Sequence, residues 1–194
     1  MVIGRVKEFD KEQVLHKAML VFWEKGYEAT SMPDLLKAMG LSRSSLYETF
    51  GDKETLYKEA LQQYRRQFSR NKRALLTNAT SAKTGIRQYF ERHIASALDD
   101  DLPGGCFITN AAVGVVSSDD PIRKPIEESF ETLEQSFYEL LKKGQQTGEI
   151  DASKDIGTLS FLLLNLNHSI NVVSKLYTDK KKYSDMLDHV MDML

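Results

Sequence analysis

Apolar residues recur every three to four positions along most of the chain, which is the period of a helix with one buried face. The clearest examples are residues 52–78, 83–98, 122–148, 155–177 and 183–194. No long segment shows the strict apolar–polar alternation of a half-buried strand, and only four prolines interrupt the pattern. The pattern therefore predicts an all-α protein.

Residues 30–55 differ, because short helices alternate there with capping and turn residues. Ser31 and Asp34 have the spacing of a capping box at a helix N-terminus. Gly40 can adopt the positive φ of a tight turn, and Ser42 can cap the following helix. That second helix presents a polar face formed by Arg43, Ser44, Ser45 and Glu48. Two capped helices joined by a glycine turn predict a helix-turn-helix.

Charge is unevenly distributed along the chain. The net charge of −2 gives no nucleic-acid signal, but residues 1–73 hold 14 Lys and Arg against 10 Asp and Glu. A basic excess that includes the helix-turn-helix is expected of a DNA-binding head on an acidic body. In the N-terminal arm, Arg5 and Lys7 could reach phosphate, a solvated tail being the alternative. We interpret a later cluster as a solvated helix end, with DNA contact as the alternative; it consists of Arg65, Arg66, Arg70, Lys72 and Arg73.

Several classes of protein and site are not supported by the sequence. One cysteine, Cys106, excludes an intramolecular disulfide framework and favours a reducing cytoplasm. The N-terminus lacks the apolar core of a secretory signal, and the most apolar run, residues 159–166, is too short to span a bilayer. Scattered histidines predict no metal site. Without paired carboxylates, a Ser–His–Asp grouping or a phosphate loop, we expect no enzyme and no cofactor.

The last two predicted helices are apolar on more than one side, so each needs more than one partner. Phe161, Leu162 and Val172 lie off the main stripe of residues 155–177. We expect a homodimer, with burial of the whole surface in one chain as the alternative. The predicted dimer contact consists of Leu159, Leu163, Leu166, Ile170, Val173, Tyr177, Met186, Leu187, Val190 and Met191.

The first third of the chain resembles the TetR/AcrR family of bacterial one-component transcriptional regulators. The resemblance covers residues 4–61 and is carried by FWEKGYEATS, Gly40-Leu41-Ser42, Leu46-Tyr47-x-x-Phe50 and Asp52-Lys53-Glu54-x-Leu56. It implies an Ω-like dimer whose subunits have a three-helix DNA-binding head (1–51), a long connecting helix (52–78) and a larger helical body (79–194). The body would bind an effector and dimerise through its last two helices.

The resemblance also implies that residues 42–49 form a recognition helix in the major groove of a palindromic operator. The guanidinium of Arg43 fits guanine O6 and N7, and hydroxyl groups can bond phosphates or base edges. Lys53 occupies the family's usual phosphate-contact position, and helix N-termini attract anions. The predicted DNA contacts are Thr30, Ser31, Ser42, Arg43, Ser44, Ser45, Tyr47, Thr49 and Lys53. Glu48 departs from the family pattern, and we interpret it as a non-contact, with a specificity determinant as the alternative.

The implied body would hold a small-molecule effector. Polar residues within the apolar helix at 155–177 favour a pocket or a dimer seam, because buried polar groups are costly unless paired. Ordinary core packing is the alternative for each candidate. The predicted lining consists of Tyr89, Phe90, His93, Cys106, Phe107, Asn110, Phe137, Asn165, His168 and Asn171.

Cys106 follows a Gly-Gly loop at a predicted helix start, where the helix dipole lowers the pKa of a thiol. Lys175 could stabilise the thiolate, whereas a buried apolar role is the alternative. The sequence thus predicts a cytoplasmic, ligand-responsive repressor that a small molecule releases from its operator. The alternatives are a redox- or electrophile-sensing repressor acting through Cys106 and an activator on the same fold.

Overall fold

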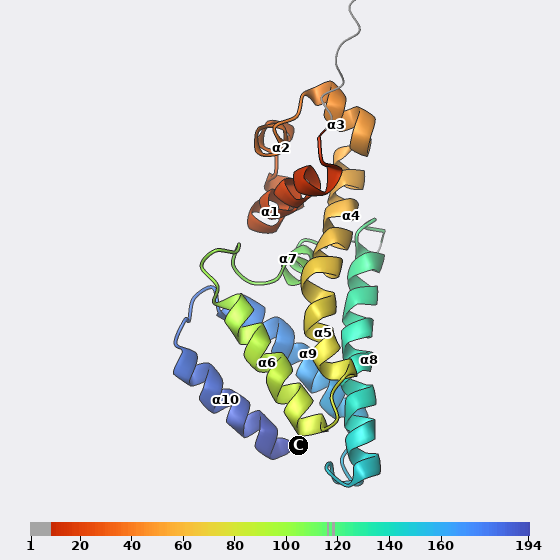
Figure 1. Cartoon of the computed structure of the whole chain (residues 1–194), viewed down its shortest axis with the longest axis vertical. Helices are drawn as coiled ribbons and strands as arrows, with labels where there is room; N and C mark the ends of the chain where they lie inside the picture. The colour runs from red at the N-terminus through yellow and green to blue at the C-terminus, as the bar shows by residue number, and fades with distance from the viewer. Residues whose placement is uncertain (1–8, 116, 118) are drawn as a thin grey trace, which may run out of the picture. The chain divides into compact units, whose positions relative to one another are not determined.

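The computed structural model describes residues 9–115, 117 and 119–194, and every regular element among them is helical (Figure 1). Arg5 and Lys7 lie outside the described residues. The prediction of an all-α protein is confirmed. Contacts divide the chain into two units, residues 1–64 and residues 65–194, which we call the head unit and the body unit.

The head unit contains α1 (Lys11–Ala29), α2 (Met32–Met39), α3 (Arg43–Phe50) and α4 (Lys53–Tyr64). Helix α1 packs against α2 and α4, and α3 packs against α4. Aromatic rings form much of this core: Phe22 meets Tyr57, and Trp23 meets Tyr64, each edge-to-face at a centroid distance of 4.9 Å. Such pairs add about 0.5–1.5 kcal/mol to the burial of their surface.

The predicted capping signals lie where the sequence indicated them. Ser31 and Asp34 form a reciprocal capping box on α2, and Ser42 caps α3 by accepting from the backbone N–H of Ser45. Gly40 ends α2 in the left-handed region, at φ 69°. Local hydrogen-bonding chemistry therefore explains why the helix-turn-helix could be predicted from the sequence.

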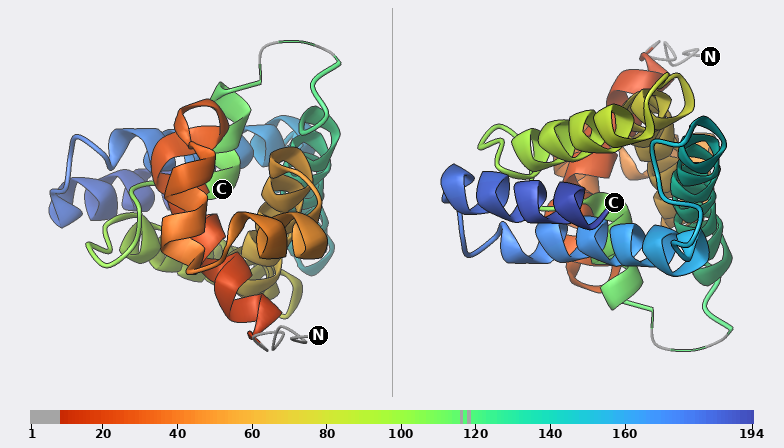
Figure 2. Two further views of the ribbon diagram at one scale, coloured as in Figure 1. Left: turned by 90° about the horizontal axis from the view of Figure 1, so that it is seen from above. Right: turned by 90° about the horizontal axis from the view of Figure 1, so that it is seen from below.

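The body unit begins with a π-helical segment, η1 (Arg65–Ser69), that continues directly into α5 (Arg70–Thr77). The other body helices are α6 (Ala82–Ala97), α7 (Phe107–Val113), α8 (Arg123–Thr147), α9 (Ile156–Val173) and α10 (Lys180–Met193). Helix α6 is central, since it contacts α5, α8, α9 and α10, and Figure 2 shows α10 beside it. Phe90 of α6 and Phe137 of α8 stack at 5.7 Å in this core.

The predicted connecting helix, residues 52–78, is helical over nearly its whole length but is not uniform. Its first part is α4, its last part is α5, and η1 lies between them. A π-helical turn inserts extra backbone into the helical ladder and is frequent at functional sites. The head unit already includes α4, so the head extends beyond the residues 1–51 expected from the sequence.

Helix α9 has 18 residues and is apolar on average, so its apolar stretch is longer than the residues 159–166 considered from the sequence. By length and composition alone this helix could cross a membrane, with a mean hydropathy of 1.3. Its buried residues instead face the body core or other body helices, and they include Leu163, Asn167 and Ile170. The helix also ends at Val173, four residues earlier than predicted.

The stripe predicted to contact a second subunit mostly faces the core of its own chain. Five of its residues are buried in that core and three pack against it, because a helical period identifies a buried face without saying what covers it. The buried ones are Leu163, Ile170, Leu187, Val190 and Met191, and the packed ones are Leu159, Leu166 and Met186. Val173 and Tyr177 remain exposed.

Gly85 allows α6 to pack closely on its neighbours. A Cβ atom at this position would lie 2.5 Å from the Ala79 Cβ and 3.0 Å from the Leu140 Cδ2. Gly85→Ala should therefore destabilise the body by about 1–3 kcal/mol through overpacking, although alanine is the better helix former by about 1 kcal/mol. Thermal unfolding followed by circular dichroism measures this loss of stability. Gln88→Ala on the exposed side of α6 is the control, and equal stability of both variants would contradict the assignment.

Candidate nucleic-acid interface and ligand cavity

The exposed face of α3 carries one guanidinium group held over an aromatic ring. The Arg43 Cζ lies 5.7 Å from the centroid of the Tyr47 ring, and both side chains are exposed. A cation–π contact of this kind orients a guanidinium and leaves its N–H groups free for bidentate bonding. Glu48 is exposed on the same helix. This pair of side chains can meet a base edge and a phosphate.

Most hydroxyl groups predicted to contact DNA also have partners within α3. The Ser42 Oγ accepts from the Ser45 N–H at 3.2 Å and lies within 3.0 Å of the Oγ atoms of Ser44 and Ser45. The Thr49 hydroxyl donates to the Ser45 carbonyl at 2.7 Å and is half-buried. Ser42, Ser45 and Thr49 thus support the helix, so any contact they make with DNA is additional to a structural bond.

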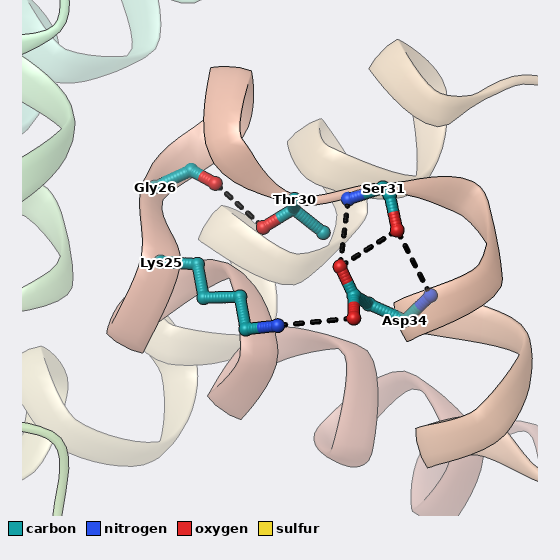
Figure 3. A network of polar contacts seen from close by, with 5 residues as sticks. All are labelled: Lys25, Gly26, Thr30, Ser31 and Asp34. Carbon is teal, nitrogen blue, oxygen red and sulfur yellow. Dashed lines mark hydrogen bonds and ion pairs between the residues drawn. The ribbon is translucent and has the colours of Figure 1, made fainter.

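The start of α2 is organised differently from the prediction (Figure 3). Thr30 is buried, and its hydroxyl donates to the Gly26 carbonyl at 2.6 Å. The Ser31 N–H donates to the Asp34 carboxylate at 3.0 Å, and the Lys25 Nζ lies 3.0 Å from the same carboxylate. A carboxylate of the protein therefore occupies the place at this N-terminus where we expected a phosphate, and the Thr30 side chain has a structural role.

Lys53 lies at the first position of α4, with its Nζ 4.4 Å from the centroid of the Tyr27 ring. The ring limits the motion of the ammonium group without neutralising it. The place of Lys53 at the start of α4 and its positive charge are those expected of a phosphate contact.

The basic excess of the first 73 residues does not belong to the head. Residues 1–64 hold 9 Lys and Arg against 10 Asp and Glu, so the excess comes from five cations at 65–73 in the body unit. The charge asymmetry that suggested a DNA-binding head therefore has another origin. In the head, individual cations such as Arg43 and Lys53 face the solvent without a large basic field around them.

The body unit contains a cavity of about 210 Å³. Side chains from η1, α5, α6, α8 and α9, with Cys106 and Ile108, form its wall. Four of the residues predicted for an effector pocket line it: Tyr89, His93, Cys106 and His168. The other lining residues were not predicted from the sequence; they are Arg65, Arg66, Ser69, Arg70, Lys72, Arg73, Ile108, Ser129, Phe130, Thr132, Leu133 and Asn167.

The remaining predicted pocket residues lie elsewhere. Phe90, Phe107 and Phe137 are buried in the core. Asn110 accepts from Lys175 at 2.8 Å, and Asn165 is exposed and bonds to the Phe161 carbonyl. The sequence pattern alone placed these residues in the pocket wrongly, because a buried or polar position on a helix can face a core, a loop or solvent.

A hydrogen-bonded network fixes the proton positions on one side of the cavity. The His93 Nε2 lies 2.9 Å from the Asn167 carbonyl oxygen, which can only accept, so Nε2 carries the proton. The other ring nitrogen, Nδ1, then accepts from the Lys72 Nζ at 3.3 Å. Burial, followed by the charge of Lys72, holds the pKa of His93 well below its usual value. Tyr89 donates to the Asn167 side chain at 2.9 Å, and burial raises its pKa.

A second network fixes His168. Asn171 donates to the Thr109 hydroxyl at 3.0 Å, and that hydroxyl lies 2.9 Å from the His168 Nδ1. The Thr109 hydroxyl can donate to Nδ1 or, with its second lone pair, accept from it, so either tautomer of the neutral ring satisfies this contact. The His168 Nε2 is buried and has no hydrogen-bond partner among the described residues. The ring stacks on Phe130 at 3.9 Å, and burial lowers the pKa of His168 to about 4.

Cys106 is buried, lines the cavity and stands at the N-cap of α7. The ammonium group of Lys175 donates to Asn110. The pairing of Lys175 with a Cys106 thiolate therefore stays a prediction. Among the described residues, no group of three or more His, Cys, Asp and Glu could hold a metal ion.

Comparisons with known proteins agree with these two units. Residues 14–60 match the model of bacterial regulatory proteins of the tetR family, and residues 82–190 match a tetracyclin repressor-like C-terminal domain. The uncharacterized HTH-type transcriptional regulator YezE of Bacillus subtilis is 32% identical over 99% of this chain and 100% of its own length.

The chain belongs to the TetR family. This is a family of transcriptional regulators and not of enzymes. The HTH-type transcriptional repressor ComR of Escherichia coli is 32% identical over 82% of this chain and 77% of its own length. A solved structure of the TetR-family regulator CifR, a cysteine mutant complexed with 26-base-pair operator DNA, has a TM-score of 0.88. Its identity is 27%, with 97% of this chain and 98% of that chain covered.

The capping box of α2 gives the TetR-family head a pH-dependent stability. Hydrogen bonds from Ser31, followed by Lys25, lower the pKa of Asp34 from 3.8 to about 2. A lowered pKa means that the ionised carboxylate stabilises the head above pH 3.8, and this stabilisation is lost as the pH falls toward 2. Asp34→Ala should therefore lower the melting temperature at neutral pH, with a difference from wild type that disappears near pH 2.

Thermal unfolding of both proteins over this pH range, followed by circular dichroism, measures the effect. Ser31→Ala removes the main cause of the shift and, as a lost cap, should cost about 1 kcal/mol. In that background, the pH dependence of the Asp34→Ala effect should largely disappear. An Asp34→Ala effect of the same size at neutral pH and near pH 2 would contradict the role of this carboxylate.

Proposed function

We propose that this chain is a homodimeric repressor that binds a palindromic operator through α3 and leaves it when a small molecule occupies the body cavity. The observation that carries the proposal is the exposed pair Arg43 and Tyr47 on the second helix of a TetR-family helix-turn-helix. ComR is a repressor, and CifR binds operator DNA. We expect the protein to act in the cytoplasm, where its DNA lies.

Chain continuity supports the link between ligand and operator. Arg65, Arg66 and Ser69 line the cavity from η1, and η1 follows α4 of the head without a break in helical structure. A ligand that binds better to one arrangement of η1 shifts the population toward it and thereby moves α4. Two recognition helices must match half-sites a set number of helical turns apart, so a small shift weakens both contacts.

The exposed side of α9 supports the homodimer. Phe161 is 57% exposed, and Leu162, Val172 and Tyr177 are exposed with it on α9 and the residues that follow. Large apolar side chains exposed along one helix indicate an interaction surface. We propose a second copy of the chain as its partner, so the contact consists mainly of α9 residues outside the stripe predicted from the sequence, together with Tyr177 of that stripe.

Arg43 and Lys53 should affect DNA binding in different ways. Arg43→Ala should cost about 1–3 kcal/mol on the operator and relax the preference at one base pair, because a bidentate contact reads that base. Lys53→Ala should weaken all sequences similarly and reduce the salt slope by about one, because it contacts phosphate. Fluorescence anisotropy with the chain's own upstream DNA and with scrambled DNA measures both.

Wild-type protein that binds both DNAs equally would contradict the proposed function. An Arg43→Ala loss that is uniform across sequences, combined with a Lys53→Ala loss confined to the operator, would reverse the assigned roles.

The dimer contact can be tested with one charge. Phe161→Glu should raise the dimer dissociation constant more than about a hundredfold, since an unpaired charge buried in an interface costs about 3 kcal/mol or more. Sedimentation velocity measures the assembly state. Ala95→Glu adds the same charge at an exposed position of α6 and should remain dimeric. A Phe161→Glu protein that dimerises as tightly as this control would contradict the proposed contact.

A further inference from the structure

Five cations line the body cavity, whereas no Asp or Glu does so among the described residues. They come from η1 and α5: Arg65, Arg66, Arg70, Lys72 and Arg73. Arg65 lies 3.8 Å from Glu128, and the other four form no ion pair with a described residue. The cluster was expected to be a solvated helix end or, alternatively, a DNA contact, but the helical run continues to Thr77 and these residues line a cavity.

We propose that this cavity binds a small amphipathic organic anion, with a carboxylate or phosphate group at Lys72 and an apolar part against Ile108, Phe130 and Leu133. The inference rests on the proposed function only in treating the cavity as the effector site. It adds the chemical class of the effector.

Lys72 is the first reason for a negative charge. Its side chain is half-buried, and the hydrogen-bond partner of its ammonium group is the neutral His93 ring at 3.3 Å. An ammonium group has three donors, so one acceptor leaves two of them unused. A buried charge without a counter-ion is costly, and proteins usually pair it. Burial also lowers the pKa of Lys72, as expected for a cation that lacks a carboxylate partner.

His168 is the second and independent reason. Its Nε2 is buried and has no hydrogen-bond partner among the described residues, while the residue itself lines the cavity. An anion in the cavity would select the tautomer with the proton on Nε2 and accept from it, with the Thr109 hydroxyl donating to Nδ1. Lys72 on α5 and His168 on α9 therefore offer hydrogen-bonding capacity to the cavity from two helices, and no carboxylate among the described residues pairs with either group.

The walls and the size limit the rest of the ligand. Phe130, Leu133 and Ile108 provide apolar surface, so the ligand is not an inorganic ion alone. A volume of about 210 Å³ lies below the range of about 300–1,000 Å³ that holds drug-sized ligands. A neutral apolar molecule would leave Lys72 unpaired, and a cation would be repelled by the lining. A one-ring carboxylate or phosphate satisfies all of these conditions.

Isothermal titration calorimetry with three one-ring probes tests the class of ligand. Benzoate and phenyl phosphate carry the two candidate head groups, and benzyl alcohol is the neutral counterpart. We expect saturable binding of at least one anion, with affinity falling as salt rises, and at least about tenfold weaker binding of benzyl alcohol. The better anion identifies the head group. Failure of both anions to bind at millimolar concentration, or equal binding of benzyl alcohol, would overturn the proposal.

Two variants locate the charge. Lys72→Met should weaken binding of the better anion at least about tenfold, which is the usual effect of losing a charged hydrogen bond. Lys142→Met removes the same charge from an exposed position of α8 and should bind like wild type. His168→Phe keeps an aromatic ring against Phe130 but removes the N–H donor, so it should also weaken anion binding. Equal affinity of Lys72→Met and Lys142→Met would overturn the proposal.

Stability separates ligand binding from a structural role. Without ligand, Lys72→Met should melt at or above the wild-type temperature, because it removes an unpaired buried charge. A merely structural lysine would give a lower melting temperature and an unchanged anion affinity. These measurements need no DNA, so failure of the protein to bind operator would refute the proposed function while leaving the anion result intact.

Discussion

The helical run from Lys53 to Thr77 is the constraint on which the rest of the protein depends. Its first part gives the head core Leu56, Tyr57 and Leu61, and its last part gives the body core Leu76. Between them the ladder widens into the π-helical turn of η1, which lines the cavity. The proposed roles in DNA positioning and ligand binding therefore both fall on one helical run.

In this protein the placement of individual charged groups matters more than the net charge. The head has nearly balanced charge, so the proposed DNA contact rests on a few individual groups such as Arg43 and Lys53. The cations that give the N-terminal part its excess lie instead around a small cavity. Placing Lys72 there without a carboxylate costs stability in the unliganded protein. The proposed anionic ligand would supply the missing counter-charge.

Helix α9 likewise has two sides with different surroundings. One side completes the body core with Leu163 and Ile170. Its polar residues Asn167 and Asn171 are held in the hydrogen-bonded networks beside the cavity. The other side exposes Phe161 and Leu162. A single helix therefore connects the ligand cavity with the proposed dimer contact.

The sequence by itself determined the elements whose causes are local. Capping by Ser31 and Ser42, the positive φ of Gly40 and the helical period gave the all-α class and the helix-turn-helix, because each depends on residues within about one turn. Tertiary structure decided what each face meets. It turned most of the predicted dimer stripe inward, engaged the start of α2 with Asp34, and gathered cations and histidines from separate helices around one cavity. A period shows that residues share a side, but only packing shows what lies opposite.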